Sequence, residues 1–420
     1  MAQNQPICES AEAKISTMAG NVLPSGSFSD AELDYVIENA SGRLLDEQRE
    51  DGHWLFELEA DATIPAEYIL LNHFLDEIDD MVEGRLAEYI RSCQGDHGGW
   101  PLFHGGQFDI SCTVKAYLAL KLIGDHPDSD HMKRAREAAL SHGGAARCNV
   151  FTRTTLALFG EVPWRAVPSM PIEIMYLPRW FPFHLSKIAY WSRTTLVPLL
   201  ILMALRPQAK NPREVTIREL FVTPPELEQR YFQIHGRMGQ FFLGIDKILK
   251  GYEKIMPMAF RRRGINLALS WCMARLNGED GLGAIFPPMA NFLMALDSLG
   301  YSKEHETRKT VRRSLDLLLT KPTGGRQYCQ PCVSPIWDTS LAALALMETG
   351  EESDGERLRR ANEWMRERQI TDIIGDWADM RPGVQPGGWA FQFHNAFYPD
   401  TDDSSVVLLA LQHSGLNWLS

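Results

Sequence analysis

Three carboxylates stand close together near the end of the chain, in the segment NAFYPDTDDSSVVLLAL at residues 395–411. Asp400, Asp402 and Asp403 directly precede an apolar run that predicts a buried helix. Three interpretations stay open on the residues alone. The aspartates cap the helix and complement its dipole, or they bind a divalent cation such as Mg²⁺, or their crowding raises the pKa of one of them so that it acts as a general acid.

Aromatic side chains lie immediately upstream of these aspartates. The segment QPGGWAFQFHNAFYPD, residues 385–400, contains Trp389, Phe391, Phe393, Phe397 and Tyr398. Ring faces stabilise a cation where water is excluded, although each of these rings is also an ordinary core residue. An aspartic acid that stays protonated in a dry, aromatic cavity can protonate a base as weak as an alkene.

The elements that must position these groups are helices. Apolar runs of about three turns, opened by small or polar residues and closed by Gly or Pro, recur along the chain. They lie at 111–124, 151–160, 192–207, 287–300, 334–350 and 400–415. Amphipathic, charge-rich segments such as 356–369 lie between them. The alternation predicts an all-α fold of two concentric layers, an α/α barrel, with a stacked helical solenoid as the alternative.

A short repeat punctuates the helices. It reads QREDGHW at 48–54, QGDHGGW at 94–100 and QITDIIGDW at 369–377, with a degenerate copy RLNGEDGLGA at 275–284. In each full copy a helix ends at Gln, a turn containing Gly follows, and Trp closes the unit. We expect the Gln amide to bind backbone groups at helix ends and the Trp ring to cover its aliphatic stem.

Composition narrows the classes of function. Hydrophobic residues make up 45% of the chain and charged residues 23%, which is typical of a chain that folds around a core. The chain carries 42 Lys and Arg against 54 Asp and Glu, a net charge of −12. This balance argues against a protein that tracks a nucleic-acid backbone, because such a protein needs a basic surface.

Targeting and cysteine patterns add little. The first 20 residues contain no apolar h-region, so no secretory signal is predicted. The most apolar run, TLVPLLILMAL at 195–205, is about half the length of a membrane span. The seven cysteines include one CxxC, Cys329 and Cys332, without the second pair that a zinc site needs or the βαβ setting of a redox motif.

Taken together, these motifs resemble one family. The chain is similar to squalene-hopene cyclases, which are class II triterpene cyclases, from about residue 40 to about residue 411. The resemblance rests on the Gln–Trp repeats, the DTDD motif and four longer segments. These are IPAEYILLNHFLD (64–76), MPIEIMYLPRW with YWSRTTLVPL (170–199), SPIWDTSLAALAL (334–346) and GDWADMRPGVQPGGWAFQF (375–393).

The resemblance implies a function and a set of site residues. Members of the family fold squalene in an apolar cavity between two α/α barrels, protonate its terminal double bond and direct a cascade of ring closures, without a cofactor or a metal. Asp402 would be the proton donor, tuned by Asp400 and Asp403. Further positions that match the family are the cation-stabilising Trp191, Trp337 and Phe391, and Glu67 in a lesser role.

Partners and location follow from the same resemblance. Squalene or a similar polyprenoid is the expected substrate, a homodimer is a candidate assembly, and no nucleic acid is expected. The protein would sit monotopically on the cytoplasmic face of the cell membrane, without a signal peptide or a transmembrane helix. The segment around Phe221 and Val222 is a candidate for the membrane contact, with a surface loop as the alternative.

Several positions depart from the family pattern. Ser404 and Ser405 follow the aspartates in place of Thr and Ala, while Lys115 and Phe286 stand where some relatives carry Glu and Gln. The chain ends 17 residues after Asp403, where the second half of the other barrel, with the His that pairs with the acid, would follow. This predicts a C-terminally truncated member of the family.

The expected organisation has three parts: an extension at 1–35, a first α/α-barrel domain at 36–310, and an incomplete second barrel at 311–420 with the acid motif. Three functions remain open on this basis. The chain is a squalene-hopene cyclase, a related cyclase of another polyprenoid, or a non-catalytic remnant that binds lipid.

Overall fold

A computed structural model describes residues 29–232, 236–349 and 355–414. Residues 1–28, with Cys8 and most of the predicted extension, lie outside this range, as does the end of the tail at 415–420. No helix among the described residues is both long and apolar enough to cross a membrane.

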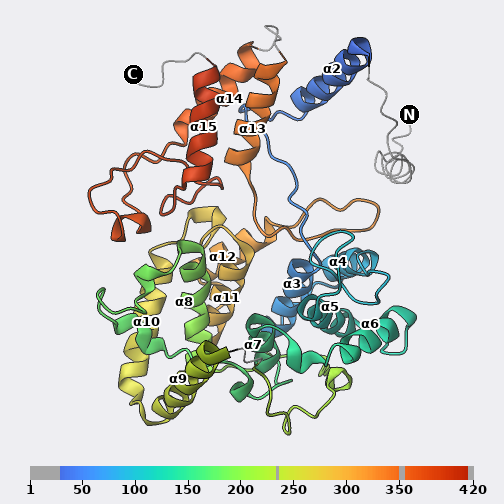
Figure 1. The fold of residues 1–420 in the computed structure, drawn as a ribbon, viewed down its shortest axis with the longest axis vertical. Coiled ribbons are helices and arrows are strands. Elements are labelled where there is room, and N and C mark those ends of the chain that lie inside the picture. The colour runs from blue at the N-terminus through green and yellow to red at the C-terminus, as the bar shows by residue number, and fades with distance from the viewer. Residues whose placement is uncertain (1–28, 233–235, 350–354, 415–420) are drawn as a thin grey trace.

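The described chain folds into helices joined by loops, with only isolated β-bridges between single residues (Figure 1). The all-α class predicted from the sequence is confirmed. The α-helices are α2 (Asp30–Asp46), α3 (Thr63–Leu75), α4 (Asp80–Ser92), α5 (Ile110–Ile123), α6 (Asp130–Ser141), α7 (Val150–Leu158), α8 (Tyr190–Leu205), α9 (Gly236–Ile255), α10 (Met258–Met273), α11 (Phe286–Ser298), α12 (Glu306–Asp316), α13 (Pro335–Glu348), α14 (Gly355–Glu367) and α15 (Thr401–His413). The 3-10 helices are η1 (Ala145–Arg147), η2 (Trp164–Ala166), η3 (Ile172–Tyr176), η4 (Leu185–Lys187), η5 (Arg218–Leu220), η6 (Gly278–Asp280) and η8 (Asp376–Asp379).

Helices α3 to α12 form the larger helical body, which is called the first barrel below. Its inner helices α3, α5, α8 and α11 are apolar on nearly every face, whereas α4, α6 and α12 bury a single stripe. Helix α3 packs on α5 and α11, α11 packs on α8, and side chains of α3, α5, α7, α8 and α11 line a shared cavity of about 300 Å³. A cavity shared by these helices favours the barrel over the open stack of a solenoid.

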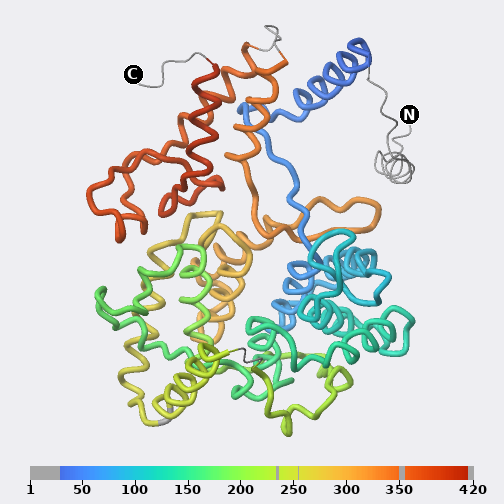
Figure 2. Tube along the Cα trace, in the orientation of Figure 1, coloured from blue at the N-terminus to red at the C-terminus, as the bar shows by residue number. Residues whose placement is uncertain are grey.

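Helices α13, α14 and α15 form a second, smaller body (Figure 1). Its core contains Ile336, Trp364, Trp389 and Leu411. A satellite cluster buries Trp54 against Ala342, Leu346 and Ala361 of α13 and α14. The segment that follows α2 therefore packs on the second body. Figure 2 shows it running beside the segment that leads into α13, and the N–H of Leu58 donates to Oε1 of Gln330 at 2.7 Å there.

The first two Gln–Trp repeats share one geometry. The Gln48 amide donates to the carbonyl of Gly52 at 2.8 Å, and the Gln94 amide to that of Gly98 at 2.6 Å. Each amide also binds a carbonyl in the first turn of another helix, α14 or α6. Both glycines have positive φ, 102° and 86°, and a Cβ at either would lie within 3 Å of a neighbouring backbone, so the turn requires Gly.

The tryptophans complete the unit. The backbone N–H groups of Trp54 and Trp100 donate to threonine hydroxyls of α13 and α5, at 3.0 and 2.9 Å. Their indole N–H groups donate to carbonyls at the C-terminal ends of α2 and α4, at 2.6 and 2.7 Å. The predicted role of Gln at helix ends is thus shared with Trp, which satisfies the free carbonyls of the helix that precedes it.

The third repeat is closed by a different residue from the one predicted. Gln369 donates to the carbonyl of Gly387 at 2.7 Å, and the indole N–H of Trp389 donates to Met365 of α14 at 2.6 Å. The prediction that Trp377 closes this repeat is wrong, because its indole N–H is buried without a partner. A long loop separates Gln369 from Trp389, and Trp377 is the first Trp after Gln369 in the sequence, so the pattern pointed to it.

The degenerate copy keeps the fold of the repeat with smaller side chains. Asn277 stands in the place of Gln and donates to the carbonyl of Gly281 at 3.2 Å. Gly283 stands in the place of Trp, and a Cβ there would lie 3.0 Å from the hydroxyl of Thr194, which is the equivalent of the threonines above. The turn is retained while the indole is lost, so the first barrel lacks this link between its layers.

Candidate active site

The acid motif begins at the N-terminus of α15. Asp400 is the N-cap of this helix, and its Oδ1 accepts the N–H of Asp403 at 2.9 Å. Its backbone is fixed as well, because its N–H donates to the carbonyl of Trp389 at 3.0 Å and its carbonyl accepts from the hydroxyl of Ser404. The capping interpretation is confirmed for Asp400. The Ser404 hydroxyl, just after the motif, joins the loop to the first turn of α15.

The other two aspartates lie in different surroundings. Asp403 is 2% exposed and its Oδ1 has no hydrogen-bond partner, whereas Asp402 is exposed. Burial, together with Asp400 and Asp402, raises the pKa of Asp403 to about 8. Burial, with the neighbouring carboxylates as lesser causes, therefore favours the protonated form of Asp403 at neutral pH. The raised pKa belongs to Asp403, whereas the resemblance makes Asp402 the donor.

The aromatic residues gather around the motif in two groups. Trp337 of α13 lies against Phe391, with 6.4 Å between ring centroids. Tyr398 stacks on Tyr190 at 4.7 Å and meets the edge of Trp191 at 5.4 Å. Trp337, Phe391 and Trp191 are each partly exposed, so their ring faces are available to a ligand. Both groups adjoin the loop that carries Asp400.

Glu67 lies elsewhere, in the cavity at the centre of the first barrel. Lys115 of α5 pairs with it at 2.5 Å, and the walls come from α3, α5, α7, α8 and α11. Burial lowers the pKa of Lys115, but the Glu67 carboxylate outweighs this effect and the pKa is raised. The pair is therefore ionic, and it gives the cavity a polar point in apolar walls.

Metal-binding and redox interpretations gain no support. Within the described ranges, no three His, Cys, Asp or Glu side chains converge as a metal site would need. Cys329 is buried and Cys332 half-buried, neither belongs to a disulfide, and burial raises the pKa of both thiols.

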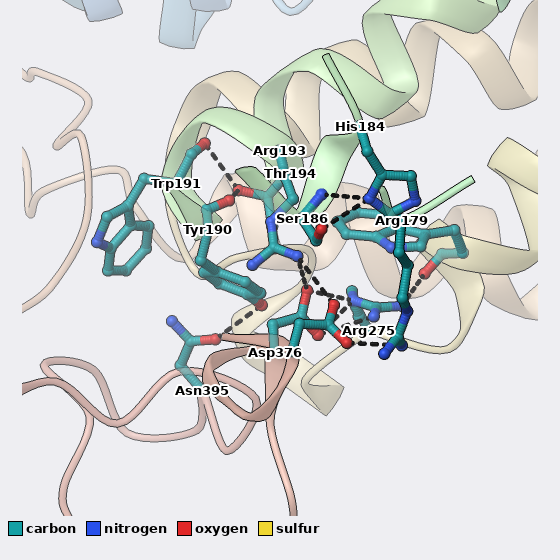
Figure 3. A network of polar contacts seen from close by, with 12 residues as sticks. Arg179, His184, Ser186, Tyr190, Trp191, Arg193, Thr194, Arg275, Asp376 and Asn395 are labelled. Carbon is teal, nitrogen blue, oxygen red and sulfur yellow. Dashed lines mark hydrogen bonds and ion pairs between the residues drawn. The ribbon is translucent and has the colours of Figure 1, made fainter. Parts of the chain in front are cut away.

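The structure also reveals contacts that sequence reasoning missed. The loop before the acid motif is held by residues of the first barrel, among them Tyr190, Arg193 and Arg275 (Figure 3). Asp376, 24 residues before Asp400, receives both arginines. The only signal in the sequence was the occurrence of an Asp in an apolar, aromatic segment, and that signal names no partner.

Comparison with known proteins defines the class. The model of the squalene-hopene cyclase N-terminal domain matches residues 37–323, and that of the C-terminal domain matches residues 333–417. The chain therefore belongs to the squalene-hopene cyclase family, as the motifs indicated.

Individual relatives agree. The chain is 49% identical over 391 residues to a squalene–hopene cyclase of Zymomonas mobilis, covering 91% of this chain. It is 51% identical over 383 residues to one of Bradyrhizobium diazoefficiens and 38% identical over 376 residues to one of Alicyclobacillus acidocaldarius, each covering 90% of this chain. The chain spans 59%, 58% and 59% of the length of these three relatives.

Proposed function

We propose that this chain carries the acid-bearing part of a squalene-hopene cyclase, which protonates squalene and starts its cyclisation to hopene or hopanol. The observation that carries the proposal is the DTDD motif, in which a buried carboxyl with a pKa of about 8 follows a loop whose Phe391 and Tyr398 pair with the partly exposed rings of Trp337 and Trp191. The names of the relatives support the choice of squalene.

In this proposal, Asp402 delivers the proton to the terminal double bond, and Asp400 and Asp403 tune it. Asp403 stays neutral at pH 7, which lowers the negative charge beside Asp402. Asp402 must be screened from water when it acts, because a hydrated carboxyl is too weak an acid for an alkene. The described residues leave Asp402 exposed, so the cover comes from the substrate or from a further segment.

The ring faces stabilise the cations that form next. Trp191, Trp337 and Phe391 present π surfaces to a desolvated substrate, an interaction worth about 2 kcal/mol or more per ring. Glu67 has a lesser role, in which its pair with Lys115 provides a polar point in the apolar cavity of the first barrel. Cyclisation of squalene to hopene is an isomerisation, in which one proton enters and one leaves, and hopanol forms by addition of water. The overall reaction needs no oxidant, reductant or cofactor.

Membrane contact is part of the same proposal, and α9 is its best support. One stripe of α9 exposes Met238, Phe241, Phe242, Ile248 and Ile255, each more than half exposed. An amphipathic helix of this kind lies in the membrane interface through its apolar face. Of the two residues predicted for this contact, Val222 is exposed but Phe221 is buried. We propose that α9 leads the attachment, on the cytoplasmic face.

Vesicle flotation tests this attachment. We expect Phe241→Glu with Ile248→Glu to abolish flotation with phosphatidylglycerol vesicles, because both charges would enter the apolar stripe. Phe103→Glu, at a position that is 68% exposed in the loop before α5, is the matched control and should float like the parent chain. Equal flotation of both variants would exclude α9 as the attachment site.

The predicted homodimer is tested by sedimentation in detergent.

Product analysis tests the chemistry. The purified chain is incubated with squalene in detergent, and hydrocarbon products are analysed by gas chromatography and mass spectrometry. We expect pentacyclic product from the chain, none from Asp402→Asn, and wild-type yield from Asp372→Asn, an exposed carboxylate of the same loop. Binding of squalene without product would instead favour the lipid-binding interpretation, and turnover of another polyprenoid alone would favour the related cyclase.

A further inference from the structure

The loop that carries the acid motif has little structure of its own. Between the end of α14 and Asp400 it contains only η8, and the rest is irregular. A loop of this length positions a reactive group only if other elements hold it. Trp389 ties the loop to α14 of the second body, and further supports come from the first barrel, from the N-terminal turn of α8 and from the segment after α10 (Figure 3).

The strongest support is an ion network centred on Asp376. The guanidinium of Arg275 binds both carboxylate oxygens, with distances of 2.7 to 3.2 Å, and Nη1 of Arg193 lies 3.1 Å from Oδ2. The side chains of Asp376 and Arg193 are 3% and 7% exposed. Asp379 reaches Arg193 only at 3.7 Å and pairs with the exposed Arg179. Asp376 is therefore the principal counter-charge of two arginines.

The network continues from Asp376 to the acid motif. The N–H of Asp376 donates to the carbonyl of Phe397 at 3.0 Å. The next residue, Tyr398, stacks on Tyr190 and touches Trp191. Asp400 follows two residues later. A second tie lies close by, where the Tyr190 hydroxyl donates to Asn395 at 3.1 Å.

Helix α8 connects these contacts to the cation-stabilising ring. Tyr190, Trp191 and Arg193 all belong to its first turn. The turn that holds Trp191 thus also holds Asp376, and through Asp376 the loop before Asp400. Helix α8 therefore fixes the position of the Trp191 ring and, through Asp376, the position of the loop that carries the acid motif.

We infer that Asp376 is a positioning residue, which fixes the acid motif relative to Trp191 by pairing with Arg193 and Arg275. The inference rests on the proposed function for the meaning of the motif, but the positioning itself is a property of the fold. Loss of the Asp376 charge removes the principal ionic tie between the loop and α8, and leaves chiefly the contacts of Tyr190 and Trp191 to hold the two together.

Amide hydrogen exchange of the full chain tests the positioning without any turnover. In Asp376→Asn we expect the hydrogen-bonded amides of Tyr398 and Asp400 to exchange about tenfold faster or more, while α3 and α5 keep their protection. Asp379→Asn, which removes the neighbouring carboxylate, is the matched control and should exchange like the parent. Parental protection of these amides in Asp376→Asn would overturn the inference.

A double variant separates positioning from the burial of unpaired charge. Asp376→Asn with Arg275→Met removes one of the two guanidinium groups that lose their counter-charge, so we expect the double variant to be more stable than Asp376→Asn alone. We expect the loop amides to remain unprotected in the double variant. Recovery of parental protection would overturn the inference, because it would show that the loop needs only charge balance and no anchor.

Turnover gives the second readout. If the parent chain cyclises squalene, kcat of Asp376→Asn should fall by about 100-fold with KM unchanged, because misplacement of a reactive group by 1 Å costs about this much while apolar binding is retained. A rise in KM at constant kcat would contradict a positioning role. A parent chain without turnover would refute the proposed function only, and the exchange result would still decide the inference.

Discussion

Substitution of Asp403 by Asn should stabilise the protein, and increasingly so as the pH rises. Asn is nearly isosteric with the protonated carboxyl and never ionises. The pKa of Asp403 is raised from its ordinary 3.8 to about 8, chiefly by burial and then by Asp400 and Asp402. The folded state therefore holds a proton that the unfolded chain releases above pH 4, and the wild type loses stability as the pH rises from about 4 to about 8.

The magnitude follows from the shift. Each pKa unit corresponds to about 1.4 kcal/mol, so a shift of about four units gives a limit near 5 to 6 kcal/mol when the carboxyl is ionised. Hydration of the opened site and coupling to Asp400 reduce this limit, as does the unpaired amide of Asn. We expect Asp403→Asn to raise the free energy of unfolding by about 2 kcal/mol at pH 8 and by nearly nothing at pH 4.

Urea unfolding followed by circular dichroism at pH 4, 6 and 8 measures this difference. Asp402→Asn removes an exposed carboxylate one residue away and should change stability by no more than about 0.5 kcal/mol at any pH. The reasoning is refuted if Asp403→Asn is less stable than the parent chain at every pH, or if its advantage does not grow between pH 4 and pH 8.

Two further predictions address the fold. Trp389→Phe should cost about 1 to 3 kcal/mol, because a buried carbonyl of α14 loses its donor, whereas Trp377→Phe removes an unpaired N–H and should cost less; urea midpoints rank the two, and the opposite ranking would restore Trp377 as the closing residue. Lys115→Met should cost about 3 kcal/mol by leaving Glu67 unpaired, and Lys115→Met with Glu67→Gln should recover most of this. Thermal melts show the recovery, and equal melting temperatures of the single and double variants would argue against an ionic pair.

Local patterns predicted the helices and the cap. Apolar residues on every face of 111–124 indicated an inner helix, and α5 is buried along nearly its whole length. Asp before an apolar run indicated an N-cap, and Asp400 is one. These features depend on neighbours within one or two turns, which the sequence displays directly.

Contacts between distant segments could not be predicted in the same way. Arg275 and Asp376 are separated by 101 positions, and nothing in either segment names the other. The same holds for Trp54, whose threonine partner on α13 lies 285 positions away. The prediction for the third repeat was wrong for a related reason. A long loop separates Gln369 from Trp389, and the nearer Trp377 matched the sequence pattern by chance.

The acid motif lies between these cases. Crowding of three aspartates predicted that one pKa would rise, but which carboxyl retains the proton depends on burial. Asp403 points into the protein and Asp402 does not, because the two residues are about 100° apart around α15. How α15 packs therefore determines which of the two aspartates is buried, and the sequence alone does not show this.

Deuterium incorporation tests the central claim most directly. Squalene incubated with the chain in D₂O should give cyclised hydrocarbon with one deuteron at the protonated end, detected by mass spectrometry, and Asp402→Asn should give none. Cyclised product without deuterium, or equal product from Asp402→Asn, would contradict protonation by this motif.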